Sequence, residues 1–251
     1  MDQHKLLTAD IVEPTLRGRF GRPYLWTEEC ASTQDALRDA SLPEGAVVVT
    51  EHQTAGRGRE GRQWDDVPGQ SLLLSLLLRP PGGLPAQQLS LVAGLAVAEA
   101  IDAVAGTAAA LKWPNDVLLD GRKVAGVLLE STQGAAICGI GVNVSQAEAE
   151  LPTATHVPPG SLRIATGGDH DRAALLVELL ERLQRRYDEW IDLGLALFLP
   201  ELGRRDALQG KAVSVGGVAG TAAGISADGR LRLRADDGSE TLVASGEVEL
   251  P

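Results

Sequence analysis

The stretch DVLLDGRKVAGVLLES, Asp116–Ser131, has two apolar runs on either side of the dipeptide Asp120-Gly121. An Asp-Gly dipeptide between apolar runs is a strong β-hairpin signal, because both residues tolerate the positive φ angles of a two-residue turn. The stretch therefore predicts two antiparallel strands. Because hairpins alternate here with helical segments, the fold class predicted for the main part of the chain is α+β, with a mixed or antiparallel sheet flanked by helices.

The flanking sequence supplies the other predicted elements. Strands are expected at Gly45–Glu51, Ser71–Pro80, Ala109–Trp113 and Ala135–Ser145, and helices from Ser32 or Thr33, over Leu89–Gly106 and over Asp171–Gly194. Pro-rich sequence after Ser145 predicts a loop, and residues 1 to about 25 are expected to wrap the body.

The character of the chain changes after Leu208. Short apolar runs are separated there by turn signals at Asp228-Gly229 and Asp237-Gly238. This spacing is typical of a small all-β barrel of the SH3 size class. The sequence therefore predicts two domains, residues 1–208 and residues 209–251.

Composition limits the function classes. The 251 residues are 44% hydrophobic and 23% charged, with a net charge of −11, as in an ordinary soluble protein. Binding to nucleic acid or to an anionic membrane depends on many Lys and Arg residues, so neither is predicted as a partner. No signal peptide is visible in MDQHKLLTAD, and Ser71–Pro80 is too short to span a bilayer.

The positions of the cysteines and histidines predict a cytoplasmic protein without a structural metal site. Cys30 and Cys138 are far apart and belong to no CxxC motif, and the four histidines show no metal-ligand spacing. Both thiols are expected to be reduced in a cytoplasmic protein. We predict no dedicated metal site.

The stretch EHQTAGRGREGRQW, Glu51–Trp64, is a local positive segment in an acidic chain. It spaces Arg57, Arg59 and Arg62 with glycines and ends on Trp64. Glycines allow close backbone approach to a ligand, arginines bind phosphate or carboxylate, and a tryptophan can stack on a flat ring. By itself the stretch fits a ligand-covering loop as well as it fits a solvated basic linker or an RGG-like nucleic-acid segment.

Three further stretches carry polar groups at the ends of predicted elements. Ala31–Thr33 begins a helix, LKWPNDVLLDGRKVAG places Lys112, Asn115, Asp116 and Lys123 around a strand and its turn, and GIGVN places Asn143 beside small residues. Taken singly, Lys123 resembles a surface lysine and the Ser32-Thr33 pair a helix cap. Their joint occurrence favours a binding site.

In this order and at these spacings, GRGREGRQW, KWPND, GRKVAG and GIGVN resemble the biotin–protein ligases of the BirA family, and the ASGEVEL end resembles the family's C-terminal domain. The resemblance runs from about Leu25 to the end and is to a ligase-only form without the N-terminal DNA-binding domain. It implies the biotin ligase catalytic fold, related to class II aminoacyl-tRNA synthetases, and an SH3-like barrel.

The resemblance also implies the activity. Biotin reacts with ATP to give biotinyl-5′-AMP, and the biotin then passes to a lysine of a biotin carboxyl carrier domain of a carboxylase. Mg²⁺ is expected on the ATP phosphates, with Asp116 as its possible protein ligand. The site must hold two anions together, which positioned cations favour, and must exclude water from the mixed anhydride. The glycine–arginine loop is expected to order over the ligand as a lid.

Site residues follow by resemblance. Lys123, Arg57 and Arg59 are expected to be catalytic, with Lys123 bridging the biotin carboxylate and the α-phosphate. The expected biotin-binding residues are Ser32, Thr33, Gln34 (where the family usually has Asn), Gln53, Gly56, Arg57, Gly58, Arg59, Lys123, Gly139 and Gly141. The expected ATP- or adenylate-binding residues are Arg57, Arg59, Arg62, Trp64, Lys112, Asn115, Asp116, Lys123 and Asn143.

Two alternatives share part of this pattern. A lipoate–protein ligase or octanoyltransferase has the same catalytic fold, but the complete arginine loop and KWPND weigh against it. A non-catalytic biotin-binding regulator would be expected to have lost some of the cations, and all five, Arg57, Arg59, Arg62, Lys112 and Lys123, are present.

Overall fold

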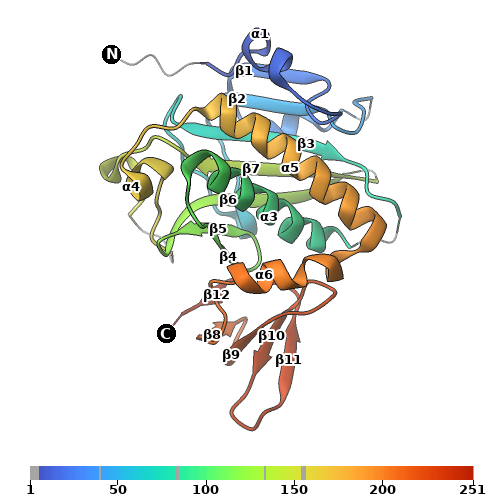
Figure 1. Cartoon of the computed structure of the whole chain (residues 1–251), viewed down its shortest axis with the longest axis vertical. Helices are drawn as coiled ribbons and strands as arrows, with labels where there is room; N and C mark the ends of the chain where they lie inside the picture. Colours follow the sequence, from blue (N-terminus) through green and yellow to red (C-terminus); the bar gives the residue numbers. More distant parts are fainter. Residues whose placement is uncertain (1–5, 40, 83–84, 133, 154–156, 251) are drawn as a thin grey trace.

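The computed structural model describes residues 6–39, 41–82, 85–132, 134–153 and 157–250. A seven-stranded sheet in the order β1-β2-β3-β7-β6-β5-β4 forms its centre, and only β1 and β2 run parallel. The predicted mixed sheet with flanking helices is therefore confirmed (Figure 1). The strands are β1 (Tyr24–Cys30), β2 (Val47–Gln53), β3 (Ser71–Leu78), β4 (Ala110–Lys112), β5 (Asp116–Leu119), β6 (Arg122–Thr132) and β7 (Ala135–Asn143).

The opening stretch forms the predicted hairpin. β5 and β6 are antiparallel, and Asp120 and Gly121 between them have φ angles of 49° and 76°, as the tight turn requires. The sequence reading missed β1. This strand lies at the edge of the sheet, and its exposed residues break the apolar alternation that usually reveals a strand.

Two long helices lie across one face of the sheet, α3 (Ala86–Ala105) and α5 (Arg172–Leu193) (Figure 1). α3 ends at Gly106, which has the left-handed conformation common after a helix. The carboxylate of Asp171 caps α5 by accepting from the amides of Ala173 and Ala174. A window of α3, Gln88–Ala105, is apolar enough to cross a membrane, but 72% of it is buried in the protein, as in the core helix of a soluble protein.

The remaining helical segments are short, and several lie where a loop was expected. They are α1 (Ala9–Val12), α2 (Thr33–Ala36), α4 (Leu162–Thr166), α6 (Leu199–Arg205) and the 3₁₀ turns Glu13–Thr15, Arg59–Gly61, Glu148–Glu150 and Leu195–Phe198. α4 was missed because it is only five residues long, too short to show a helical period in the sequence.

The C-terminal part contains the second sheet that the sequence predicts. Its five strands are all antiparallel, in the order β11-β10-β9-β8-β12. One hydrophobic core extends across both sheets, and the indole Nε1 of Trp113 donates to the carbonyl of Gly229, 3.0 Å away. The strands are β8 (Ala212–Val215), β9 (Val218–Ile225), β10 (Leu231–Arg234), β11 (Glu240–Val243) and β12 (Val248–Glu249). The division at residue 208 stays a prediction.

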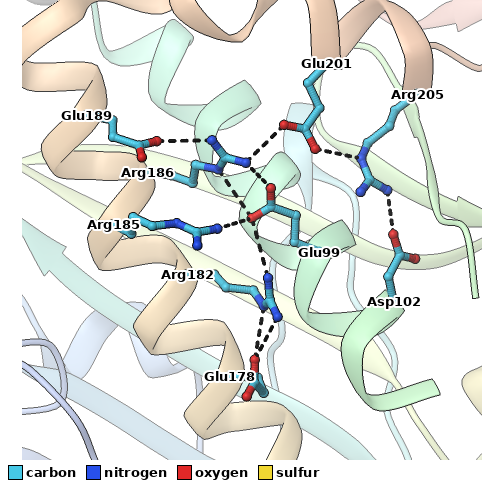
Figure 2. A network of polar contacts seen from close by, with 9 residues as sticks. All are labelled: Glu99, Asp102, Glu178, Arg182, Arg185, Arg186, Glu189, Glu201 and Arg205. Atoms are coloured by element: carbon cyan, nitrogen blue, oxygen red, sulfur yellow. Dashed lines mark hydrogen bonds and ion pairs between the residues drawn. The ribbon is translucent and has the colours of Figure 1, made fainter. Parts of the chain in front are cut away.

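A network of charged side chains joins α3, α5 and α6 (Figure 2). At its centre the carboxylate of Glu99, 7% exposed, contacts Arg186, Arg185 and Arg182. Arg186 also reaches Glu201 of α6, at 3.0 Å. Burial acts to raise the pKa of Glu99, but the guanidinium groups, first that of Arg186, outweigh it and lower this pKa below its ordinary value of 4.5.

We expect Glu99→Gln to lower the free energy of unfolding by about 2 kcal/mol at pH 7, because it removes the carboxylate that three guanidinium groups share, while Arg186 keeps Glu189 and Glu201. A carboxylate with a lowered pKa stabilises the fold above its ordinary pKa, and this stabilisation is lost as the pH falls through the lowered value. The difference between variant and parent should therefore shrink below about pH 4.5. Urea unfolding at several pH values measures it.

Glu178→Gln is the matched control. Glu178 is more exposed, and within the described residues its one ion pair is with Arg182, so its loss should change the free energy of unfolding by less than about 1 kcal/mol. Equal effects of the two substitutions would contradict a central role for Glu99.

Candidate active site

A cavity of about 430 Å³ opens on the face of the sheet opposite α3 and α5. Successive residues of a strand point to opposite faces. In β7, Cys138 and Val142 join the core, while Gly139, Gly141 and Asn143 line the cavity, and Ile140 belongs to the core and also borders the cavity. Fifteen of the seventeen predicted site residues line it: Ser32, Thr33, Gln34, Gln53, Arg57, Gly58, Arg59, Arg62, Trp64, Asn115, Asp116, Lys123, Gly139, Gly141 and Asn143.

The two other predicted site residues lie just behind this lining. Gly56 is buried and its carbonyl accepts from the amide of Trp64, at 3.0 Å, at the base of the glycine–arginine loop. Lys112 is 3% exposed at the end of β4, and its Nζ reaches Glu247 at 3.4 Å. Both residues therefore act on the cavity through a neighbour.

One end of the cavity is a small cluster of hydroxyl and amide groups. The Oε1 of Gln53 accepts from the amide and the hydroxyl of Thr33, at 2.9 and 3.2 Å, and the Thr33 and Ser75 hydroxyls are 2.7 Å apart. Ser32 begins α2 without a capping hydrogen bond from its side chain. This end offers neutral donors and acceptors in a buried setting.

Two glycines of β7 are required by the side chains that lie on them. A Cβ on Gly139 would come within 2.6 Å of Nε2 of Gln34, and a Cβ on Gly141 within 2.6 Å of the Trp64 ring. The strand therefore supplies a flat floor on which Gln34 and Trp64 rest. The sequence reading included both glycines in the site by resemblance, and this close packing is the physical reason for their size.

In the described part of the chain, four of the five predicted site cations, all except Arg59, contact carboxylates. Nζ of Lys123 lies 2.7 Å from Asp116 Oδ1 and 5.7 Å from the centre of the Trp64 ring. Glu247 contacts both Lys112 and Arg62, at 3.4 and 2.7 Å. Burial acts to raise the pKa of Glu247, but attraction by Lys112 and Arg62 exceeds it, so the net shift of this pKa is downward.

The two asparagines hold the cavity walls. Nδ2 of Asn115 donates to the carbonyl of Val127 at 3.0 Å, and Nδ2 of Asn143 donates to that of Gly160 at 2.9 Å. Both amides therefore tie a strand end to a neighbouring segment at the place where sequence resemblance expects the nucleotide.

Several residues that shape the cavity were missed from the sequence. Glu247 comes from the C-terminal sheet, and Asp35 and Glu130 flank Arg57. The buried carboxylate of Asp66 accepts from the backbone amide of Gln53 and contacts His52 Nδ1 at 2.9 Å, which closes the base of the glycine–arginine loop. They carry no local sequence signal, because their partners are distant in the chain.

Asp116 has the chemistry of a ligand for the Mg²⁺ ion of a magnesium nucleotide. Oδ1 of Asp116 is buried and accepts no well-directed hydrogen bond, although the Lys123 ammonium is close. Mg²⁺ commonly uses one or two carboxylates together with substrate phosphates. Within the described residues no group of three His, Cys, Asp or Glu side chains forms a metal cluster. Asp116 is thus the carboxylate suited to such an ion.

Comparison with known proteins identifies the family. Residues 26–146 match the Biotin/lipoate A/B protein ligase family, and residues 210–250 match the Biotin protein ligase C terminal domain. The Bifunctional ligase/repressor BirA of Bacillus subtilis is 33% identical over 250 residues, which cover 92% of this chain and 75% of that protein. This chain belongs to the biotin protein ligase family.

Other relatives support the same activity. The Biotin--[acetyl-CoA-carboxylase] ligase of Mycobacterium tuberculosis is 39% identical over 82% of this chain and 79% of its own length. The structure of an Aquifex aeolicus biotin protein ligase in complex with biotin and ATP superposes with a TM-score of 0.82 at 32% identity, covering 90% of this chain and 97% of that one. The chain is an ATP-dependent biotin–protein ligase, and the recognition made from the four sequence motifs is confirmed.

We expect Gly141→Ala to displace the Trp64 ring, because the added methyl group would overlap it. Biotin-dependent pyrophosphate exchange should fall at least about tenfold, as expected when a misplaced group loses its catalytic geometry. The Trp64 indole resonance in an NMR spectrum should shift at the same time. Gly203→Ala, which adds a methyl group in open space, is the control and should leave both unchanged. An unshifted indole resonance in Gly141→Ala would contradict the packing argument.

Proposed function

We propose that this cavity carries out two half-reactions in sequence. In the first, a carboxylate oxygen of biotin attacks the α-phosphorus of ATP, and the bond to the leaving pyrophosphate breaks. In the second, a lysine amine of a biotin carboxyl carrier domain attacks the carbonyl carbon of biotinyl-5′-AMP, and AMP leaves. The amide bond formed joins biotin to the acceptor, and the amine gives up a proton.

The observation that supports this proposal is the polarity of the cavity from one end to the other. The neutral cluster of Thr33, Gln53 and Ser75 lies beside Gly139, whereas Lys123 and Trp64 lie over Gly126 and Gly141, two positions further along the strand. A neutral head group with an anionic tail matches this gradient. Biotin has both, since its ureido ring is uncharged and its tail ends in a carboxylate.

We assign the neutral end to biotin. Ser32, Thr33 and Gln53 hold the ureido group and the ring, and the groups that Thr33 and Gln53 already pair with keep them in place. Gln34, Gly139 and Gly141 border the path of the tail. Gly56, Arg57, Gly58 and Arg59 form the loop that covers it.

We assign the charged end to the nucleotide. Trp64 stacks on adenine, and Asn115 and Asn143 form the wall beside it. Arg59 and Arg62 face the phosphates, and Lys112 acts on them through its ion pair with Glu247. Lys123 contacts the biotin carboxylate and the α-phosphate together. Positioned cations of this kind stabilise the charge that develops on the leaving pyrophosphate.

Mg²⁺ supplies Lewis acidity when it is bound to the ATP phosphates, and Asp116 is the carboxylate that would hold it. We also propose a cytoplasmic location, because Cys30 and Cys138 are both free thiols, which a reducing compartment keeps reduced.

The acceptor is tested by intact mass. We expect a biotin carboxyl carrier domain incubated with the enzyme, ATP, Mg²⁺ and biotin to gain the mass of one biotin on one lysine. A parallel reaction with lipoate tests the related enzyme class and should leave the acceptor unmodified. Labelling with lipoate but not with biotin would contradict the proposal.

We expect Lys123→Ala to lower biotin- and Mg²⁺-dependent pyrophosphate exchange by on the order of 10²- to 10³-fold, the usual cost of losing a positioned electrostatic group. Transfer from supplied biotinyl-5′-AMP should fall less, because the two anions no longer have to be brought together. Lys123→Arg should restore little, since a planar fork does not replace a compact charge.

Lys211→Ala, at an exposed position, controls for loss of a lysine and should behave as the parent. Lys123→Ala should remain folded, because the substitution removes the ion pair with Asp116 but keeps the backbone hydrogen bonds to Pro158 and Gly160. Exchange at the parent rate in a folded Lys123→Ala variant would contradict the bridging assignment.

A further inference from the structure

A closed ring of four charged side chains lies at the mouth of the cavity, on the loop side. Arg57 of the glycine–arginine loop contacts Asp35 at the end of α2 and Glu130 on β6, and Arg38 contacts the same two carboxylates. Two positive and two negative charges alternate around the ring, so that it is neutral as a whole. Of these four residues, the resemblance to the family predicts a role for Arg57 only.

All three nitrogens of the Arg57 guanidinium donate hydrogen bonds within this ring. Nη1 and Nη2 donate to the two oxygens of Asp35 at 2.9 and 3.0 Å, and Nε donates to Glu130 Oε1 at 3.1 Å. A bidentate fork and a third bond from Nε leave no free edge for a bidentate contact with phosphate. The bond from Arg57 is also the first cause of the lowered pKa of Asp35.

The ring extends into the biotin side of the cavity through one amide. Nη2 of Arg57 donates to Oε1 of Gln34 at 3.3 Å, and Nε2 of Gln34 donates to the carbonyl of Leu128 at 3.0 Å. Gln34 in turn lies directly on Gly139. The orientation of this amide therefore depends on where the ring holds Arg57.

Arg59 differs from Arg57 in its contacts. In the part of the chain that the structure describes, its side chain makes no hydrogen bond or ion pair, whereas Arg62 pairs with Glu247. The residue between them, Glu60, has a φ of 57° and precedes Gly61 at 73°. The loop is thus pinned at Arg57 and follows a left-handed backbone beyond Arg59.

We infer that Asp35 and Glu130 are positioning residues of the ligase reaction, which hold Arg57 as the fixed anchor of the loop and fix Gln34 along the biotin tail. Arg59 is then the loop arginine available to the ligand anions. This inference rests on the proposed position of biotin in the cavity. It adds Asp35 and Glu130, which act through Arg57, to the residues needed for the ligase reaction.

The test uses Asp35→Asn together with Glu130→Gln, which removes both negative charges with little change of shape. We expect KM for biotin in pyrophosphate exchange to rise about tenfold, within the usual range for coupled contacts, while KM for ATP changes less than about twofold. Amide hydrogen exchange should speed up at residues 54–58 without ligand. Asp228→Asn, in an exposed Asp–Arg pair on the C-terminal sheet, is the control and should change neither.

Arg57→Gln supplies the decisive comparison. If the two carboxylates act through Arg57, adding both acidic substitutions to Arg57→Gln should raise KM for biotin by less than about twofold more. A full tenfold increase in KM for biotin when the two acidic substitutions are added to Arg57→Gln would overturn the inference. So would an unchanged KM for biotin together with unchanged amide hydrogen exchange in the Asp35→Asn, Glu130→Gln variant. Failure of the parent to show biotin-dependent exchange would refute the proposed function instead, and the hydrogen-exchange comparison would still test the ring.

Discussion

The mutual repulsion of two anions is the constraint around which this molecule is arranged. A carboxylate and a triphosphate must meet in a site from which water is excluded, and unscreened repulsion at contact distance in such a site costs several kcal/mol. We propose that Lys112, Lys123, Arg59 and Arg62 offset this repulsion. Lys112, Lys123 and Arg62 already contact carboxylates in the structure, and we propose that ligand anions enter by exchange with these partners.

The fold makes this arrangement possible by giving the two faces of one sheet different tasks. One face buries leucine, valine and isoleucine under α3 and α5, and the charge network around Glu99 holds these helices to α6. The other face carries glycines and short polar residues, which leave room for the ligands. The C-terminal sheet shares the same core and delivers Glu247 to the cavity.

Much of this fold can be predicted from local sequence patterns. The hairpin at Asp120-Gly121, the long helices and the buried strand Ser71–Leu78 follow from turn chemistry and apolar period. The four motifs also lie around one cavity, because each lies in a strand of the central sheet or directly follows one. Local patterns do not reveal β1, an edge strand with exposed polar positions, or α4, which is too short to show a period.

The carboxylate partners of the predicted site cations could not be predicted from the sequence, for a different reason. Arg57 with Glu130 and Lys112 with Glu247 are separated by 73 and 135 residues, so only the folded chain brings them together. The sequence therefore predicts which cations gather at the cavity, but not which carboxylates hold them.

A crystal structure with biotin and a non-hydrolysable ATP analogue tests the exchange of partners most directly. The distance from Nζ of Lys123 to Oδ1 of Asp116, 2.7 Å here, should lengthen beyond the range of an ion pair as Nζ moves onto the biotin carboxylate and the α-phosphate. Arg57 should stay on Asp35 and Glu130. A bound complex in which Lys123 keeps its contact with Asp116 and touches neither ligand would contradict the account.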